Sequence, residues 1–155
     1  MQKSSFLKIF LLFLLGMGGF WLFNANAKDN LHWLDDGKVA LAQAKKENKL
    51  VLLDFTGSTW CPACMALHKE VFSTPKFEDY SKKFVLLRVD FPDPVSVPRK
   101  GAALVSKYLT GDIALPTILI LSPEGKKLGT VDYKPGGPDV FIGDVEKIVK
   151  AQPHS

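Results

Sequence analysis

The sequence has little cysteine. Cys61 and Cys64 are the only two cysteines in 155 residues, and they stand three positions apart in the run WCPAC. They leave three possibilities: a structural disulfide, half of a metal site, or a dithiol that exchanges electrons with other proteins. A disulfide across so small a loop removes little chain entropy and stabilises a fold poorly. The sequence holds no second cysteine pair that could restore such a dithiol, so its redox partner must lie outside this chain.

The sequence also lacks a strong excess of charge of either sign. It has 20 Lys and Arg residues against 16 Asp and Glu residues, a formal net charge of +4, with the lysines scattered among the acids. So mild a balance does not imply nucleic acid as a partner. Internal repeats, low-complexity segments and long linkers are absent as well. Beyond its first 27 residues the chain therefore has the size and composition of one domain.

The first 27 residues have the three parts of a secretory signal. Lys3 and Lys8 come first, an apolar run follows over 9–23, and ANA at 25–27 matches a cleavage pattern. The apolar run is shorter than the roughly 20 residues that a membrane-spanning helix needs. We therefore expect the signal to be cleaved; an uncleaved anchor is the alternative.

We therefore expect a signal peptide at 1–27 and a single domain at 28–155. Without Lys3 and Lys8, 18 basic residues face 16 acidic ones, which leaves a net charge of +2. The expected location is the periplasm or another exported compartment, where the surroundings oxidise neighbouring cysteines.

Apolar patterns predict the order of helices and strands. The runs LVLLDF and FVLLRVDF are almost wholly apolar, as in strands that are covered on both faces. The order predicts an α/β fold with a mixed central β-sheet flanked by helices on both faces. The expected helices lie at 37–48, from the cysteines onward, from 74–75 onward, at 99–109 and from 138 onward; the expected strands lie at 50–55, 84–91, 117–121 and 127–133.

The position of the cysteines predicts their chemistry. Because they follow the strand that ends at Phe55, Cys61 should lie at the N-terminus of a helix. Unpaired N–H groups and the helix dipole stabilise an anion there, which lowers the pKa of a thiol and favours the nucleophilic thiolate. Cys64 lies one turn further, where it can resolve a mixed disulfide. Pro62 falls in the first turn, where proline is tolerated and stiffens the short ring.

These residues resemble those of a known family. WCPAC, preceded by a strand that ends in Asp54-Phe55 and followed later by Leu115-Pro116-Thr117, is similar to thioredoxin and its exported relatives. The phrases LPTILILSPEG and KEVF resemble the C-terminal domain of DsbD and small secreted proteins of the DsbH kind most closely. The resemblance implies a thioredoxin-like fold and a thiol-disulfide oxidoreductase. Its redox-active group would be the Cys61–Cys64 disulfide alone, with no cofactor and no metal.

The resemblance also implies roles for residues outside the cysteine pair. Pro116 should follow a cis peptide bond and pack against the disulfide, which leaves the main chain of Leu115 to pair with an extended substrate. Asp54 should lie buried beneath the cysteines, have a raised pKa and accept the proton of Cys64. The alternative for Asp54 is a carboxylate at the edge of a strand with no catalytic part.

The residues next to the cysteines bear on substrate binding and on the direction of electron flow. Trp60, Pro62 and Ala63 should form the surface around the reactive sulfur, although Trp60 could instead be a core aromatic. The oxidising relative DsbA has a histidine where this chain has Ala63, and a charged histidine there stabilises the thiolate. Its absence favours a more reducing couple, and hence reduction or isomerisation of disulfides in exported cysteine-containing proteins.

Other readings of the motif remain open. With the two cysteines, His68 could form a copper site for metal binding or delivery, although a surface histidine is the simpler interpretation. A thioredoxin-fold binding module with a structural disulfide is a third possibility. For the oxidoreductase we expect a monomer that is reduced by a membrane partner of the DsbD kind.

Overall fold

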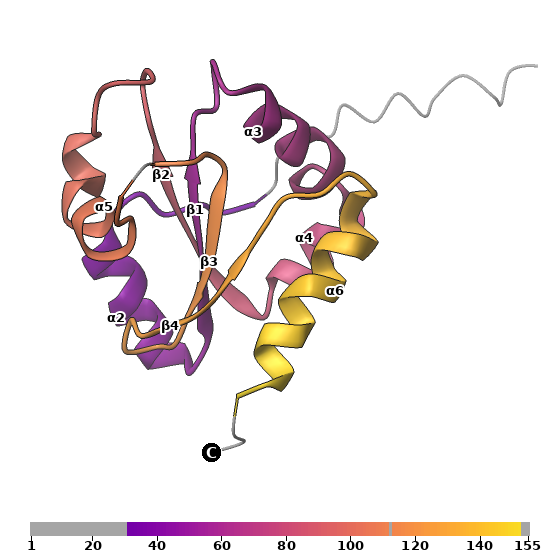
Figure 1. Cartoon of the computed structure of the whole chain (residues 1–155). Helices are drawn as coiled ribbons and strands as arrows, with labels where there is room; N and C mark the ends of the chain where they lie inside the picture. Colours follow the sequence, from indigo (N-terminus) through magenta and orange to yellow (C-terminus); the bar gives the residue numbers. More distant parts are fainter. Residues whose placement is uncertain (1–30, 112, 153–155) are drawn as a thin grey trace, which may run out of the picture.

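The computed structural model describes residues 31–111 and 113–152. The signal peptide expected at 1–27 lies outside the described residues, so it stays a prediction. A four-stranded sheet lies at the centre of the fold (Figure 1). Its strands are β1 (Leu50–Thr56), β2 (Phe84–Asp90), β3 (Thr117–Leu121) and β4 (Lys127–Val131).

The sheet is mixed, as the sequence predicts. Its strand order is β2-β1-β3-β4, in which β1 pairs parallel with β2 and antiparallel with β3. β3 in turn pairs antiparallel with β4. The carboxyl ends of β1 and β2 therefore meet the start of β3 at one end of the sheet, where Phe55 lies opposite Thr117.

Helices cover both faces of this sheet, which confirms the predicted architecture (Figure 1). α2 and α5 lie on one face, and α3, α4 and α6 lie on the other. None of the helices in the described part of the chain is long and apolar enough to cross a membrane. The helical segments are α2 (Gly37–Glu47), α3 (Pro62–Leu67), the π-helix η1 (His68–Phe72), α4 (Pro75–Ser81), the 3₁₀ turn η2 (Arg99–Gly101), α5 (Ala102–Tyr108) and α6 (Gly137–Lys150).

Local side chains determine where two of the helices begin. The Asp36 carboxylate accepts the N–H groups of Lys38 and Val39 at 2.8 and 3.1 Å and so caps α2. Thr74 caps α4 in the same way, and Pro75 occupies the first helical position, where no N–H is needed. Both starts agree with the sequence-based expectation.

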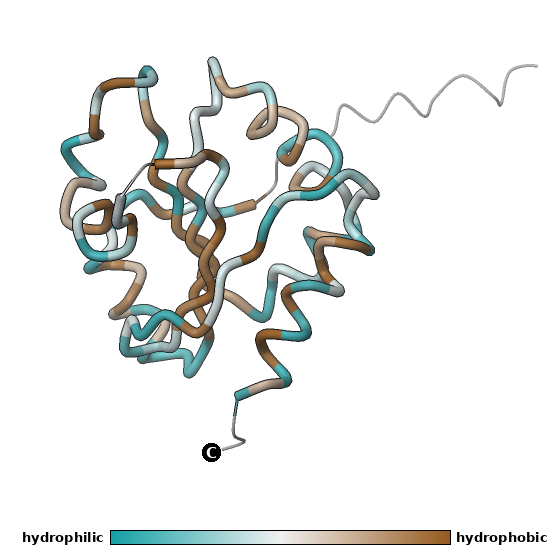
Figure 2. Tube along the Cα trace, viewed as in Figure 1, coloured by the Kyte–Doolittle hydropathy of each residue, from teal (hydrophilic) through white to brown (hydrophobic). Residues whose placement is uncertain are grey.

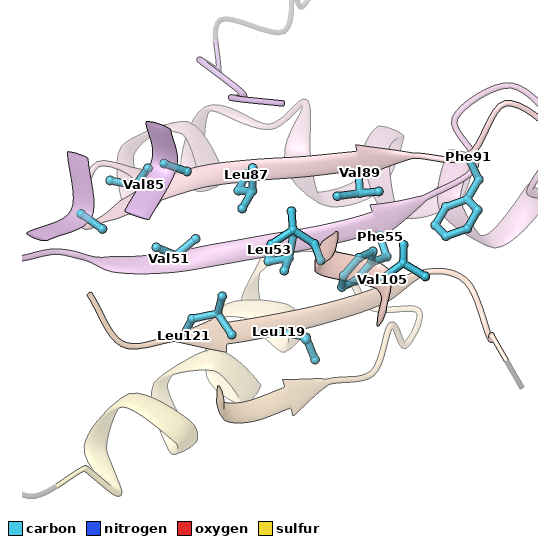
Figure 3. Packing of buried hydrophobic residues seen from close by; sticks show 13 residues of the cluster. Val51, Leu53, Phe55, Val85, Leu87, Val89, Phe91, Val105, Leu119 and Leu121 are labelled. Atoms are coloured by element: carbon cyan, nitrogen blue, oxygen red, sulfur yellow. The ribbon is translucent and has the colours of Figure 1, made fainter. Parts of the chain in front are cut away.

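Alternate side chains of the strands enter two separate cores. One core lies between the sheet and helices α2 and α5, and it receives Val51, Leu53 and Phe55 of β1 (Figure 3). The other lies beneath α3, η1, α4 and α6, and it receives Leu52 of β1 together with Ile118 and others. In Figure 2 the central strands are mostly brown, the colour of hydrophobic residues. β1 is therefore covered on both faces, as its apolar run predicts.

The observed elements differ from the predicted ones mainly at their ends. The segment expected to be helical over 99–109 begins with the 3₁₀ turn η2, and the regular helix ends at Tyr108. This start packs tightly on β2: a Cβ atom added to Gly101 would lie 2.2 Å from Val89 Cγ1, so only glycine fits there without a shift. The strand expected to reach residue 133 ends at Val131.

The aromatic cluster beneath α6 should be a main source of stability. The ring of Phe72 is buried within 4.8–5.6 Å of the ring centroids of Trp33, Phe77 and Phe141. Phe72→Ala should lower the free energy of unfolding by about 3–5 kcal/mol, because it leaves a cavity in a packed core. Urea denaturation of the oxidised protein would measure this change. The exposed Val39→Ala should change the stability by less than about 0.5 kcal/mol, and equal effects of the two variants would contradict the assignment.

Candidate active site

The two cysteines stand at the start of a helix, as their spacing predicts. Cys61 is the N-cap of α3, and its sulfur accepts the N–H of Cys64 at 3.2 Å. Pro62 occupies the first helical turn. A disulfide joins the two cysteines, whose Cα atoms lie 5.2 Å apart. Leu67 and Val71 point into the core behind them and anchor this helix on the sheet.

The two cysteines line different cavities. Cys61 lines a groove of about 330 Å³, here called the outer groove. Cys64 lines a cavity of about 200 Å³ on the inner side, here called the inner cavity. The outer groove is formed by Trp60, Cys61, Pro62, Phe91, Pro94, Val95, Ser96, Val97, Ile113 and Leu115. The inner cavity is formed by Asp54, Thr56, Ser58, Cys64, Met65, His68, Phe72 and Arg88.

The outer groove is apolar, and much of its lining is exposed. None of its lining residues carries a charge. Val95 is 91% exposed, and Val97 and Ile113 are exposed as well. The loop that holds the valines is ordered by the Asp93 carboxylate, which accepts the N–H groups of Val95 and Ser96 at 2.9 and 2.8 Å. An uncharged surface therefore lies beside the sulfur of Cys61.

The segment before β3 closes the groove opposite the disulfide. The peptide bond between Leu115 and Pro116 is cis, in agreement with what the resemblance implies. The carbonyl oxygen of Leu115 lies 3.7 Å from Cys61 Sγ. A disulfide sulfur carries no hydrogen, so in this oxidised form the approach is a contact and not a hydrogen bond. The main chain of Leu115 therefore lies beside the reactive sulfur.

Trp60 combines the two roles that the sequence leaves open. Its indole N–H donates to the carbonyl oxygen of Phe91 at 2.8 Å, and its ring packs on the core between the sheet and α2 and α5. The same ring lines the outer groove next to Cys61. Trp60 thus ties the loop after β2 to the start of α3 and also forms part of the surface around the sulfur.

Asp54 lies beneath the cysteines, buried with 1% exposure. Arg88 on β2 is its register partner, and Arg88 Nε donates to Asp54 Oδ2 at 3.3 Å. Burial raises the pKa of Asp54 from 3.8 to about 6, although the charge and hydrogen bond of Arg88 oppose this rise. Asp54 Oδ1 has no hydrogen-bond partner. The predicted burial is confirmed, the direction of the pKa shift agrees with the prediction, and the part of Asp54 in catalysis stays a prediction.

Arg88 and Trp33 are two residues of this site that the sequence analysis does not identify. The Trp33 ring lies 4.1 Å from the Arg88 guanidinium carbon, an arrangement typical of cation–π contacts. Leu34, which follows Trp33, bonds to the outer edge of β2 through Leu86 and Arg88. The sequence did contain one signal: Arg88 is the single basic residue in the apolar run FVLLRVDF, as Asp54 is the single acidic residue in LVLLDF.

The structure brings most of the predicted site residues together. Trp60, Pro62 and Leu115 share the outer groove with Cys61, whereas Asp54 shares the inner cavity with Cys64. Ala63 is exposed on the first turn of α3, and Pro116 is half-buried next to Leu115; neither lines the groove itself. The loop that contributes Val95 and Val97 lies between the strand expected at 84–91 and the helix expected at 99–109, and its place in the groove was not predicted.

The described residues offer little for a metal site. Within residues 31–111 and 113–152, no group of three or more His, Cys, Asp and Glu side chains could hold a metal ion. His68, the histidine considered as a copper ligand, lines the inner cavity beside Cys64, and its Nδ1 lies 3.2 Å from Ser73 Oγ. No observation in the described structure therefore favours the copper interpretation.

A disulfide between neighbouring cysteines at a helix start, after the central strand of a mixed sheet and opposite a cis-proline, defines the class of thiol-disulfide oxidoreductases. The chain belongs to the thioredoxin-like family, whose model matches residues 32–123. As in that class, the redox-active group is the Cys61–Cys64 pair of the protein itself.

Individual relatives agree with this assignment. The chain is 28% identical over 130 residues to the disulfide bond reductase DsbH of Chlamydia pneumoniae. This alignment covers 80% of this chain and 76% of that protein. It is 39% identical over 88 residues to the thiol:disulfide interchange protein DsbD of Klebsiella pneumoniae, which covers 57% of this chain but 13% of that protein. The solved structure of a DsbH oxidoreductase superposes with a TM-score of 0.68 at 28% identity and covers 79% of this chain and 87% of that one. The resemblance to DsbH is thus confirmed.

The raised pKa of Asp54 predicts a dependence of stability on pH. The folded protein holds the Asp54 proton more tightly than the unfolded chain, so stability falls as pH rises from about 4 to about 6 and stays lower above that. Asp54→Asn removes the buried charge and should raise the free energy of unfolding at pH 7 by roughly 1–3 kcal/mol. The difference should shrink as pH falls from 6 towards 4, because the wild-type carboxyl then becomes neutral.

Urea denaturation across this pH range, with the disulfide intact, would measure the effect. Asp132→Asn is a matched control, because Asp132 is exposed directly after β4. A lower stability of Asp54→Asn at neutral pH would show instead that the pairing with Arg88 outweighs the burial of the carboxylate.

Proposed function

We propose that this protein reduces or isomerises disulfides of exported, cysteine-containing proteins in the periplasm. The observation that carries the proposal is the unequal placement of the two cysteines. Cys61 lines the uncharged outer groove, where a substrate can reach it, whereas Cys64 lies on the inner cavity with Asp54. This difference supports an attacking role for Cys61 and a resolving role for Cys64.

The reductive cycle follows from this arrangement. The Cys61 thiolate, stabilised by the N–H of Cys64, attacks one sulfur of a substrate disulfide, and the other substrate sulfur leaves as a thiolate. Cys64 then loses its proton to Asp54 and attacks Cys61 Sγ. The bond between Cys61 and the substrate breaks, and its electron pair leaves with the substrate sulfur. Two electrons have passed from the dithiol to the substrate, and the Cys61–Cys64 disulfide remains.

The outer groove is proposed to hold the substrate. Trp60, Pro62 and Ala63 would contact it on the cysteine side, and the main chain of Leu115, next to Pro116, would pair with an extended substrate segment. The approach of the Leu115 carbonyl to Cys61 Sγ supports this placement, because a bound segment there lies within reach of the sulfur.

The reductive direction and the partners are inferred from two further observations. Ala63 is exposed between the cysteines and carries no charge. It therefore does not stabilise the Cys61 thiolate of the reduced form, which would make the disulfide easier to reduce. The relative DsbH is named a disulfide bond reductase, and DsbD is named a thiol:disulfide interchange protein. We therefore expect a membrane partner of the DsbD kind to restore the dithiol, and we expect the protein to act as a monomer.

Single replacements of the two cysteines should separate the two steps. Cys61→Ser should abolish the reduction of insulin disulfides, because the attacking sulfur is lost. Cys64→Ser should still attack but should accumulate a covalent mixed disulfide, which mass spectrometry would detect. The exposed Val39→Ser serves as the control and should retain wild-type activity. Equal turnover by Cys61→Ser and the wild type would refute the proposed function. A Cys61–Cys64 pair that stays oxidised in cells with all their reducing partners present would refute it as well.

The outer groove can be tested with an exposed residue that is not needed for folding. Val95→Asp should lower kcat/KM roughly threefold to tenfold for a peptide disulfide with leucine beside its cysteine, because burial of a valine side chain contributes on the order of 1.5 kcal/mol. The same variant should reduce glutathione disulfide at the wild-type rate. Val39→Asp, at an exposed valine on α2, is the matched control. An equal loss of kcat/KM on both substrates would show that the replacement affects the reaction of the cysteines and not substrate binding in the groove.

A further inference from the structure

The proposed role of Asp54 requires a route for protons. In each reductive turnover Cys64 must lose a proton before it attacks, and Asp54 is the carboxylate that shares its cavity. The Asp54 side chain is buried, and its Oδ1 atom has no hydrogen-bond partner. A proton that arrives on this carboxyl cannot pass directly to bulk solvent, so another group must carry it outward.

The inner cavity has the size and the lining for such a route. Its volume is about 200 Å³, several times the roughly 30 Å³ that a water molecule occupies in the liquid. The side chains of Thr56 and Ser58 also line it; the Thr56 hydroxyl is a suitable partner for water, and the Ser58 oxygen can accept from water while its O–H donates to Asp90. Water in this cavity would connect Asp54 and Cys64 with the other ionisable side chains of the lining, His68 and Arg88.

His68 is the member of this lining that is suited to exchange protons with solvent. Its backbone N–H donates to the carbonyl oxygen of Cys64, so the two side chains lie one helical turn apart on the same face. The residue is half-buried and thus reaches both the cavity and the surface. The hydroxyl of Ser73, 3.2 Å from Nδ1, orients the ring. Imidazole gains and loses a proton between about pH 5 and 8, whereas guanidinium does not.

The charges around the cavity are few. Burial is the main cause of the raised pKa of Asp54; Arg88 opposes it, Asp90 at the end of β2 adds to it, and a charge on His68 lowers the pKa slightly. β3, on the other side of β1, has no ionisable side chain. Lys69 and Glu70, which follow His68, are exposed. Arg88 and Asp90 therefore act on the charge of Asp54 more strongly than His68 does, and His68 is the member of the lining whose side chain can carry a proton outward.

We propose that His68 transfers protons between Asp54 and solvent through water in the inner cavity. The inference rests on the proposed function. Asp54 takes the proton of Cys64, the Cys64 thiolate forms the disulfide with Cys61, and the substrate sulfur leaves with the electron pair. The proton then passes from Asp54 to His68 and from His68 to solvent, where it neutralises the substrate thiolate. His68 acts only through Asp54: it carries the proton away and does not itself contact the reacting sulfurs.

The test is the dependence of turnover on buffer concentration in His68→Gln and His68→Ala. Multiple-turnover reduction of a peptide disulfide, with dithiothreitol as the reductant that restores the dithiol, would be followed by stopped flow between about pH 5 and 8, at low and high concentrations of imidazole buffer. At low buffer concentration both variants should react on the order of 5- to 10-fold more slowly than the wild type, and added imidazole should restore the rate. The wild-type rate should not depend on the buffer. A structural defect would not be repaired by a small base.

Two controls sharpen the test. Lys69→Ala, at the exposed neighbour of His68, should behave as the wild type at every buffer concentration. The double variant Asp54→Asn/His68→Gln should be no slower than Asp54→Asn alone, because His68 acts only through Asp54. Wild-type rates in both His68 variants, or a loss that imidazole does not restore, would overturn the proposal. A wild-type protein that reduces no disulfide would instead refute the proposed function itself, so the two failures are distinguishable.

Discussion

The burial of β1 on both faces and along both edges is the constraint on which the site depends. β1 pairs with β2 on one side and with β3 on the other, and its side chains enter both cores. A strand in that position has no freedom to shift, since a slip by one residue would exchange its two faces. The loop that leaves its carboxyl end therefore starts from a rigid point, and the cysteines follow within a few residues.

The same burial gives Asp54 its properties. It is a charged residue in a strand whose other side chains are apolar or small, and only a partner on a neighbouring strand can compensate its charge. Arg88 supplies that partner from β2, and Trp33 lies against the Arg88 guanidinium. The compensation is partial, because one carboxylate oxygen stays without a partner. A carboxyl that is only partly compensated has a pKa in the range where it can both accept and release a proton.

The helix that begins at Cys61 divides the site into two environments. One cysteine lines an uncharged groove built from three loops, and the other lines a small cavity above β1 that holds the ionisable side chains of Asp54, His68 and Arg88. Because the two sulfurs lie one helical turn apart, no movement of the chain is needed to bring them together. Their surroundings nevertheless differ, and the proposed division into an attacking and a resolving cysteine rests on this difference.

The elements of the fold could be predicted from the sequence because each has a local cause. Apolar runs mark β1 and β2, Asp36 and Thr74 mark helix starts, and the spacing of the cysteines marks the start of α3. The irregular starts and ends escaped prediction; the 3₁₀ turn before α5 ends at Gly101, whose close approach to Val89 is a contact between distant segments. The π-helical turn η1 had no recognised signal either.

By itself, the sequence determined the order of the elements, the reactive pair and the family, because these depend on short-range patterns and on a motif. Only the tertiary structure decided which side chains surround each sulfur. Arg88 lies 34 positions from Asp54, and the valines of the outer groove belong to a loop far along the chain from Cys61. Such neighbours arise from strand pairing and loop packing, and no local pattern of residues encodes a contact between segments so distant in the sequence.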